Sequence, residues 1–282
     1  MKKSFFKKVY KNLGSDKNFY KYNQEIYNYK NLQNSFFSFV RTISSLERKC
    51  KNKICTLSNK SFNFYATVVS ILLTNNTWIP LSTSFPEERL KKILIALKPD
   101  IIFVDREHFA KIKNLDISYL NIKIYEIERF FEKNENGKNL NYKNLIDTQE
   151  DDDVAMIFFT SGSTGDPKGV PITHKNFLTC FFGQYENFYK KKRGLVFADF
   201  HDSSFVISLV ILLPCIYTCS SLTPAKTSLD FFRPLTHIKK NNVNVLITVP
   251  SFINQIKNNT LDKNRNINLK ILILCGETFY LQ

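Results

Sequence analysis

The residues best suited to chemistry lie in one glycine-rich stretch near the middle of the chain, residues 160–169, which read TSGSTGDPKG. Glycines let the backbone turn with positive φ and bring N–H groups close to an anion. Serine and threonine hydroxyls add short donors, and Lys168 adds a mobile positive charge. This composition suits a polyphosphate, although the spacing of Gly162 and Lys168 does not fit the Walker A pattern GxxxxGK(S/T). An ordinary Ser/Gly turn between a strand and a helix is the alternative.

The glycine content of the rest of the chain makes this stretch stand out. The sequence has 8 glycines in 282 residues, and three of them (Gly162, Gly165 and Gly169) fall here. The apolar run Val154–Phe159, VAMIFF, comes directly before and predicts a buried strand. A cluster of glycines at the end of a strand, in a chain that otherwise avoids glycine, needs a local reason.

Apolar patterns along the chain predict the elements that position this stretch. Apolar residues at helical spacing predict an amphipathic helix over residues 29–48. Ser84, with Pro86 and Glu87 after it, is expected to cap a helix that stops before Pro99. Further helices are expected over residues 61–73, 174–189, 204–213, 228–241 and 250–258. Strands are expected over residues 54–57, 77–81, 101–104, 154–159, 243–249 and 269–275.

These strands define the fold class. They lack clean polar–apolar alternation and are separated by helices, which predicts an α/β protein with mostly parallel sheets covered by helices. Residues 131–153 are polar and charged, so we expect a loop or linker there. No internal repeat is present.

The charge of the chain is strongly positive, with 40 Lys and Arg against 25 Asp and Glu, a net +15. Such a surplus can indicate a nucleic-acid partner. Lysines are spread along the whole chain, however, and no single expected helix carries a basic stripe interleaved with aromatic residues. We therefore expect no nucleic-acid partner and keep a basic nucleic-acid binder only as a competing hypothesis.

Cysteines and apolar segments indicate a compartment. The six cysteines form no CxxC pair and no zinc-ligand spacing, so we expect packed core thiols in a reducing cytoplasm and no metal site. The first residues lack the apolar stretch of a signal peptide. Phe205–Leu222 is the most membrane-like segment, but Pro214 and several hydroxyl residues favour a buried helix that ends near Pro214, with no membrane association.

Val154–Phe177, VAMIFFTSGSTGDPKGVPITHKNF, resembles the phosphate-binding motif of the AMP-binding, adenylate-forming enzyme superfamily. The nearest resemblance is to amino-acid adenylation domains and D-alanine–carrier-protein ligases, and acyl-CoA synthetases belong to the same group. Leu72–Leu90 resembles the family's segment around Tyr-Val-Pro and Tyr-Pro-x-x-Arg, with Asn75-Asn76 in place of a small Gly pair and Ser82 where Asp is common. His201–Ser204 resembles the Phe-Asp-x-Ser motif, and Ile271–Glu277 resembles the Cys-Gly-Glu strand end.

The resemblance implies an activity and a nucleotide site. Members of the family convert a carboxylate and Mg-ATP to an acyl-adenylate and pass the acyl group to a thiol of coenzyme A or of a carrier protein. The expected phosphate-binding residues are Thr160, Ser161, Gly162, Ser163, Thr164, Gly165 and Lys168, with Lys168 and Thr164 as the catalytic pair. Gly276 and Glu277 are expected at the nucleotide, and ATP and Mg²⁺ are the implied cofactors. His174 is expected either to face the substrate cavity or to hold a structural place at the start of a helix.

The resemblance also implies a substrate pocket. Asp202 is expected to pair with the α-ammonium group of an amino acid, because a carboxylate in an apolar pocket is costly unless it meets a cation. His201 offers the competing register, that of acyl-CoA synthetases acting on other carboxylic acids. Capping of the following helix by Asp202 or Ser203 is the structural alternative for both. Cys275 is expected to line the same pocket.

The domain organisation follows from the extent of the resemblance, about Tyr29 to the last residue. Residues 1–28 are expected to form a lead-in and residues 29–282 the N-terminal part of an adenylation domain, without the C-terminal domain. The family's later motifs, including the usual Mg²⁺ ligands, cannot be placed before Gln282. We therefore expect the isolated chain to be inactive or very weak unless a second polypeptide supplies the missing half. A non-catalytic pseudoenzyme that binds nucleotide or a partner protein is the alternative of a different class.

Overall fold

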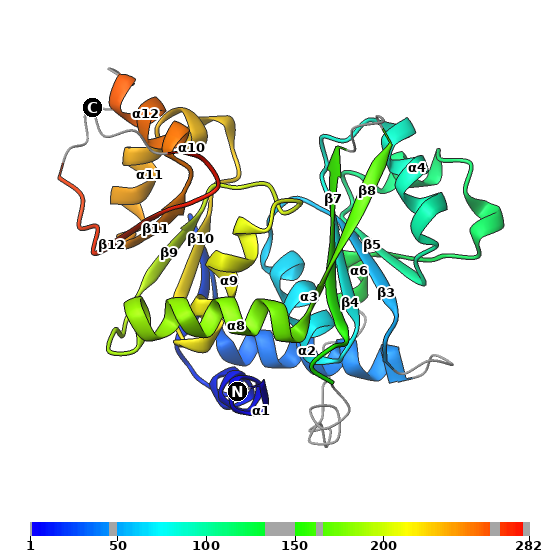
Figure 1. Ribbon diagram of the computed structural model, residues 1–282, viewed down its shortest axis with the longest axis horizontal. Coiled ribbons are helices and arrows are strands. Elements are labelled where there is room, and N and C mark those ends of the chain that lie inside the picture. The colour runs from blue at the N-terminus through cyan, green and yellow to red at the C-terminus, as the bar shows by residue number, and fades with distance from the viewer. Residues whose placement is uncertain (1, 45–49, 133–149, 162–165, 260–265, 279–282) are drawn as a thin grey trace. The chain divides into compact units, whose positions relative to one another are not determined.

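The computed structural model describes residues 2–44, 50–132, 150–161, 166–259 and 266–278. The chain divides into two compact units (Figure 1). Unit 1 consists of residues 1–7 and 31–179, and unit 2 consists of residues 8–30 and 180–282. The divisions fall inside helices α1 (Lys2–Leu13), α2 (Tyr29–Ser44) and α8 (His174–Gln184), so all three helices contribute residues to each unit.

Unit 1 contains a six-stranded sheet in the order β6-β5-β3-β4-β7-β8. All neighbouring strands pair in parallel except β8, which runs antiparallel to β7 at one edge. The strands are β3 (Lys53–Leu57), β4 (Thr77–Leu81), β5 (Ile101–Val104), β6 (Lys123–Glu126), β7 (Val154–Ser161) and β8 (Pro167–Thr173). Strands β3, β4 and β5 are almost wholly buried, which explains why their sequences are continuous apolar runs.

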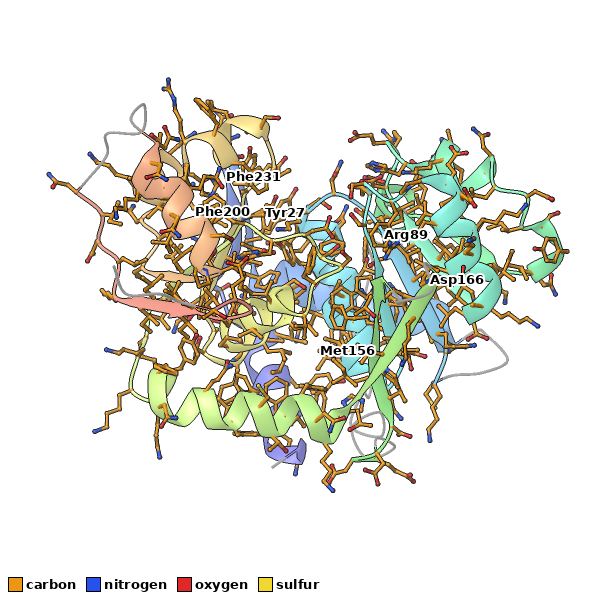
Figure 2. The ribbon with its side chains drawn as sticks, turned by 45° about the horizontal axis from the view of Figure 1, so that its top comes forward. Tyr27, Arg89, Met156, Asp166, Phe200 and Phe231 are labelled. Atoms are coloured by element: carbon orange, nitrogen blue, oxygen red, sulfur yellow. The ribbon has the colours of Figure 1, made fainter. Side chains whose placement is uncertain are left out.

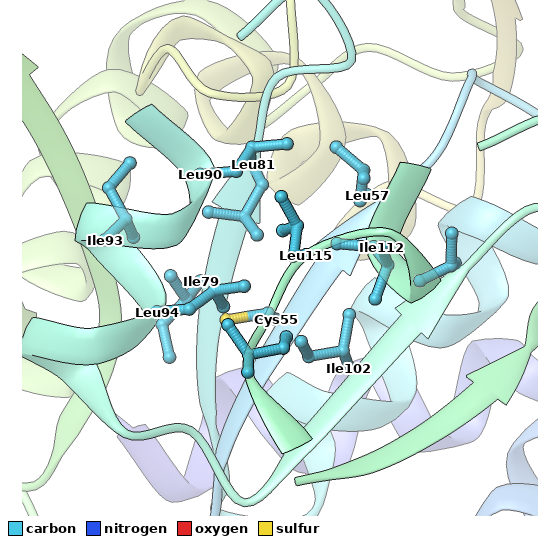
Figure 3. Packing of buried hydrophobic residues seen from close by; sticks show 12 residues of the cluster. Cys55, Leu57, Ile79, Leu81, Leu90, Ile93, Leu94, Ile102, Ile112 and Leu115 are labelled. Carbon is cyan, nitrogen blue, oxygen red and sulfur yellow. The ribbon is translucent and has the colours of Figure 1, made fainter. Parts of the chain in front are cut away.

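Helices between these strands cover the sheet of unit 1. They are α2 (Tyr29–Ser44), α3 (Phe62–Leu73), α4 (Glu87–Leu97), α5 (Phe109–Lys113), the short 3₁₀ turn η1 (Ser118–Leu120) and α6 (Ile127–Glu132). One core cluster joins β3, β4 and β5 to α4 and α5; Cys55, Ile79, Leu94 and Ile102 lie at its centre, all with fully buried side chains (Figure 3). Burial of these aliphatic side chains fixes α4 against the sheet.

Unit 2 contains a second six-stranded sheet in the order β12-β11-β9-β10-β1-β2. Pairing is parallel throughout except for β2, which runs antiparallel to β1 at one edge. The strands are β1 (Asn18–Tyr22), β2 (Glu25–Asn28), β9 (Val196–Asp199), β10 (Ser221–Pro224), β11 (Val245–Thr248) and β12 (Ile271–Leu274). The remaining helical elements are the π-helical turn η2 (Tyr185–Tyr189), α9 (Ile207–Tyr217), α10 (Ser228–Phe232), α11 (Pro234–Lys240) and α12 (Pro250–Asn258).

The predicted fold class is confirmed: the chain is α/β with two mostly parallel sheets covered by helices. Residues before 29 include the folded elements α1, β1 and β2, and β1 pairs with β10. Strands β1, β2, β6, β8, β9 and β10 were not predicted; their sequences are short, polar or interrupted by charged residues.

Three predicted helix boundaries are wrong for identifiable reasons. Helix α9 continues through Pro214 to Tyr217, because almost every residue around the proline is buried and packing compensates for one lost backbone hydrogen bond. The helix expected over 228–241 is two helices, since Pro234 forces Arg233 out of helical geometry (φ −123°, ψ 64°). Ser84 does not cap α4; its hydroxyl lies 2.8 Å from that of Ser82 instead.

The segment expected as a loop over 131–153 begins inside α6, and residues 133–149 lie outside the described part of the chain. Within the described residues, none of the helices has both the length and the apolar composition needed to cross a bilayer.

Candidate functional site

The glycine-rich stretch lies between two antiparallel strands of unit 1. Ser161 at the end of β7 pairs with Pro167 at the start of β8, and Thr160 pairs with Lys168. Both Thr160 and Lys168 are exposed, and the Thr160 hydroxyl donates weakly to the Lys168 carbonyl at 3.5 Å. Gly162, Ser163, Thr164 and Gly165 lie outside the described residues, as does the side chain of Ser161. The arms of the hairpin thus place one hydroxyl and one ammonium group beside the glycine-rich segment.

The negative charge of this stretch is already balanced. Lys92 of α4 binds the carboxylate of Asp166 at 3.0 Å, and the charged pair is exposed. One turn earlier on the same helix, the Arg89 guanidinium lies over the Phe85 ring, 4.5 Å from its centroid; Arg89 and Asp166 are labelled in Figure 2. Because the Asp166 carboxylate binds Lys92, the positive charge of Lys168 in β8 favours an anionic ligand.

His174 begins α8 directly after β8 and is fully buried in unit 1. Its ring packs edge-on against Phe6 at 5.6 Å between centroids and tilted against Phe177 at 5.4 Å. Its backbone N–H donates to the carbonyl of Asp153 at 3.0 Å. The imidazole therefore lies in an aromatic core at the junction of β8 and α8.

The start of β7 is held by a separate polar cluster. The carboxylate of Asp153 binds Lys51 at 2.8 Å and accepts hydrogen bonds from the Asn75 amide at 3.1 Å and the Glu150 backbone at 3.0 Å. Partial burial disfavours the charged form, but these donors outweigh it and lower the pKa of Asp153 from 3.8 to about 2. Asn75, the first residue of the Asn75-Asn76 pair, therefore has a structural partner in Asp153.

In unit 2, three adjacent parallel strands place their carboxyl ends at one edge of the sheet. Residues that follow or end β9, β11 and β12 meet there: His201, Thr248 and Cys275. The His201 Nε2 atom lies 3.2 Å from the Thr248 hydroxyl, and the Cys275 N–H donates to the Thr248 carbonyl at 3.1 Å. Carboxyl ends of parallel strands are the usual place for ligands in open α/β sheets.

Cys275 and Gly276 follow β12 at this edge. The Cys275 thiol lies 3.9 Å from the Thr248 carbonyl, and burial raises its pKa. Gly276 has φ +85°, a conformation that L-residues rarely adopt, and a Cβ there would lie 3.5 Å from Val249 Cγ1. The positive φ, more than crowding, requires glycine at this position.

Glu277 acts as a helix cap. Its carboxylate accepts hydrogen bonds from the Ser251 backbone N–H at 2.9 Å and the Ser251 hydroxyl at 2.8 Å, at the first turn of α12. A carboxylate at a helix N-terminus satisfies free N–H groups and complements the helix dipole. The cap ties the loop after β12 to the start of α12.

Asp202 lies beside His201 at the entry to α9. Its carboxylate accepts a hydrogen bond from the Ser204 N–H at 2.8 Å, and its carbonyl accepts one from the Phe205 N–H at 3.1 Å. The side chain is partly exposed. This turn geometry satisfies the local backbone and leaves carboxylate surface accessible.

An aromatic cluster supports this edge from inside unit 2. The Phe200 ring packs against Phe231 at 6.1 Å between centroids (Figure 2), Phe252 at 5.0 Å and His237 at 5.2 Å. Burial disfavours the charged form and lowers the pKa of His237, although its Nδ1 lies 3.0 Å from the Asp230 carboxylate. The packing of Phe200 fixes the backbone from which His201 projects.

Sequence reasoning missed two residues of this edge. Thr248 closes β11 and contacts both His201 and Cys275, while Ser251 receives Glu277. The sequence does contain a sign of Thr248: it is a polar residue at the carboxyl end of an apolar run, as Asp199 is at the end of β9. Asking which polar residues end the predicted parallel strands would have found Thr248.

The side-chain groups at the β7–β8 hairpin suit a phosphate-bearing ligand better than a metal ion. Hydroxyl and ammonium groups on the hairpin arms are the chemistry that holds phosphate oxygens. Within the described ranges, no group of three or more His, Cys, Asp or Glu side chains could hold a metal ion. We therefore assign no residue to Mg²⁺.

Comparisons with known proteins define the class. A sequence model of the AMP-binding enzyme family matches residues 6–280. The D-alanine–D-alanyl carrier protein ligase of Listeria innocua is 25% identical over 272 residues, covering 92% of this chain and 50% of the ligase. The corresponding ligase of Listeria welshimeri is 27% identical over 209 residues, covering 72% of this chain and 39% of the ligase.

Solved structures share the fold at lower identity. The adenylation domain AlmE of Vibrio cholerae, determined with glycyl-adenosine-5'-phosphate, superposes with a TM-score of 0.71 at 19% identity, covering 92% of this chain and 51% of AlmE. VinN superposes with a TM-score of 0.75 at 13% identity, covering 99% of this chain and 69% of VinN. These likenesses establish the fold of the large domain of adenylation enzymes.

The chain belongs to the AMP-binding enzyme family, the adenylate-forming enzymes. Both curated relatives described above are D-alanine–D-alanyl carrier protein ligases. The family match begins at residue 6. The chain spans about half the length, or less, of these curated relatives.

Proposed function

We propose that this chain contributes to the ATP-dependent activation of a carboxylate, an amino acid, as an acyl-adenylate for transfer to a thiol. The observation that carries the proposal is the β7–β8 hairpin, whose arms present Thr160 and Lys168 on either side of a glycine-rich segment in a chain of the AMP-binding family. Support for an amino-acid substrate comes from the partly exposed carboxylate of Asp202 and from the ligases of Listeria.

The chemistry has two steps. A carboxylate oxygen attacks the α-phosphorus of ATP, forming a new O–P bond while the bond to the β-phosphate oxygen breaks and pyrophosphate leaves. A thiol sulfur then attacks the acyl carbon, forming a thioester and releasing AMP. Both leaving groups are anions, so catalysis depends on positive charge and hydrogen-bond donors placed around the phosphates.

In the proposal, each half of the reaction uses residues of this chain. Lys168, Thr160, Ser161 and Thr164, with the glycines at 162 and 165 and Ser163, hold the β- and γ-phosphates. Asp202 meets the substrate α-ammonium group, and Cys275 with the Gly276 backbone lines the acyl side. Glu277 contributes by fixing the Cys275–Glu277 loop to α12.

The thiol acceptor is proposed to be the phosphopantetheine of a carrier protein, in keeping with the names of the Listeria relatives. A non-catalytic role, nucleotide binding without turnover, is the second candidate.

The test combines nucleotide binding with turnover. Binding of ATP to residues 1–282 is measured by calorimetry for the wild type, for Lys168→Ala and for Lys123→Ala, an exposed lysine of β6 that serves as the matched control. We expect at least a fivefold loss of affinity in Lys168→Ala alone, as removal of one charge-assisted contact of about 1–2 kcal/mol implies. Equal affinity in all three proteins would refute the assignment of the hairpin.

ATP–pyrophosphate exchange then separates the candidate functions. Exchange dependent on glycine or D-alanine, but not on their N-acetyl derivatives, supports amino-acid activation, because acetylation removes the cation that Asp202 would bind. ATP binding without exchange for any carboxylate, with or without a second polypeptide that carries the part of the Listeria ligases outside this match, favours the non-catalytic role. Exchange with N-acetylated or simple fatty acids alone would favour the acyl-CoA synthetase alternative.

A further inference from the structure

One contact at the carboxyl edge of the unit 2 sheet has a chemical consequence for His201. The Thr248 hydroxyl lies 3.2 Å from His201 Nε2, and the Thr248 side chain is fully buried. Within the described part of the chain, this imidazole nitrogen is the one hydrogen-bond partner of that hydroxyl. The bond can run in either direction, depending on which atom carries the proton.

Burial decides the direction. If His201 Nε2 carried a proton and donated, the Thr248 hydroxyl proton would need an acceptor elsewhere, and an unsatisfied buried donor is costly. If the hydroxyl donates to Nε2, both atoms are satisfied by one bond. The second arrangement requires that Nε2 is unprotonated, so the imidazole is neutral and carries its proton on Nδ1.

We propose that Thr248 is a positioning residue that fixes His201 as the neutral Nδ1–H tautomer. The effect of this tautomer on substrate binding rests on the proposed function; the tautomer itself does not. A neutral His201 adds no positive charge next to Asp202, so it does not compete with a substrate ammonium group for the Asp202 carboxylate. The ring itself becomes a donor through Nδ1–H, suited to a carboxylate or carbonyl oxygen.

Other groups around His201 favour the protonated imidazolium ion over this tautomer, so the outcome of a measurement is not fixed in advance. The carboxylate of Asp199, buried at the end of β9, accepts a hydrogen bond from the His201 backbone N–H at 3.2 Å. Asp202 adjoins it in the chain. Two nearby carboxylates favour an imidazolium ion, and the Thr248 hydroxyl, a donor with no other partner in the described residues, favours the neutral ring.

The experiment reads the ring nitrogens directly. The full chain is labelled with ¹⁵N-histidine, and long-range ¹H–¹⁵N spectra are recorded at neutral pH; the chain has four histidines, and His201→Gln identifies the resonances of His201. We expect the wild type to show the Nδ1–H pattern for His201. An Nε2–H or imidazolium pattern in the wild type would overturn the proposal, whatever the variants do.

Two variants at position 248 test whether the hydroxyl is the cause. Thr248→Val keeps the shape and removes the donor, and we expect His201 to lose the single Nδ1–H pattern. Thr248→Ser restores the donor, and we expect the wild-type pattern to return. An unchanged pattern in Thr248→Val, with the fold intact by circular dichroism, would also overturn the proposal.

Exchange kinetics keep this inference distinct from the proposed function. Where amino-acid-dependent exchange is observed, Thr248→Val should raise the KM for the amino acid about five- to tenfold, with a smaller change in kcat and recovery in Thr248→Ser. If no protein shows exchange, the proposed function fails, and the tautomer of His201 is still decided by the spectra. An unchanged KM beside an altered tautomer would refute the link to substrate charge.

Discussion

Replacing Asn76 by alanine should destabilise unit 1 more than any change at Asn75, the other member of the Asn pair. The Asn76 side-chain oxygen accepts hydrogen bonds from the Asn52 backbone N–H and the Asn52 amide, each at 2.9 Å. Its own amide donates to the Thr74 hydroxyl at 2.8 Å. All three residues are buried, so water cannot replace the bonds.

The magnitude follows from the number of donors affected. Asn76→Ala removes the acceptor of two buried donors on Asn52, and each such loss costs about 1–3 kcal/mol before relaxation, so we expect about 2–4 kcal/mol in total. Asn75→Gly is the matched control: Asn75 has φ 54°, which glycine adopts without strain, and the bond from its amide to the Asp153 carboxylate is lost. We expect that control to lie within about 1 kcal/mol of the wild type.

The assay is urea unfolding of the full chain, monitored by circular dichroism at about 222 nm, where the signal reports helix content. The reasoning is refuted if Asn76→Ala is no less stable than Asn75→Gly, since both variants remove an asparagine from the same turn. A larger loss in Asn75→Gly would mean that the Asp153 cluster, and not the Asn52 network, holds the turn between α3 and β4.

Three further predictions concern other polar contacts. The folded-state pKa of Asp153 is lowered from 3.8 to about 2, so its carboxylate should stabilise the fold by about 1–2 kcal/mol. This contribution is fully present above pH 4 and is lost as the pH falls through 2. Urea unfolding across this range should show the difference in unfolding free energy between the wild type and Asp153→Asn becoming smaller as the pH falls. Tyr29→Phe should cost about 1–2 kcal/mol in the same assay, because the buried Tyr29 hydroxyl lies 3.0 Å and 2.8 Å from the carbonyls of Cys215 and Ser220. Glu277→Ala should cost about 1 kcal/mol by removing the cap of α12. Ser251→Ala keeps the backbone N–H bond to Glu277 and loses only the hydroxyl bond, so it should cost less, and the double variant should be no less stable than Glu277→Ala alone.

The fold was predictable where burial leaves a strong pattern. Strands β3, β4, β5 and β11 are apolar runs buried on both faces, and the sequence predicts each of them within two residues of its observed bounds. Strand β8 could not be predicted in this way, because its side chains are mostly exposed and only its pairing with β7 makes it a strand. Propensity could not place the break at Arg233 either, since the helical apolar spacing continues across it and Pro234 decides the geometry.

The two parts of the candidate site were predictable in opposite ways. The composition of residues 160–169 predicts phosphate binding, but the antiparallel pairing of the flanking strands β7 and β8 is not evident from the sequence. At the carboxyl edge of unit 2 the reverse holds: Thr248 has no motif around it, yet its position follows from topology. Because β9, β11 and β12 are parallel neighbours, with Thr248 paired to Leu274, the residues that end them must gather at one edge. A residue that ends the middle strand then lies between groups from both neighbouring strands: the Thr248 hydroxyl contacts His201, and the Thr248 carbonyl accepts a hydrogen bond from the Cys275 N–H.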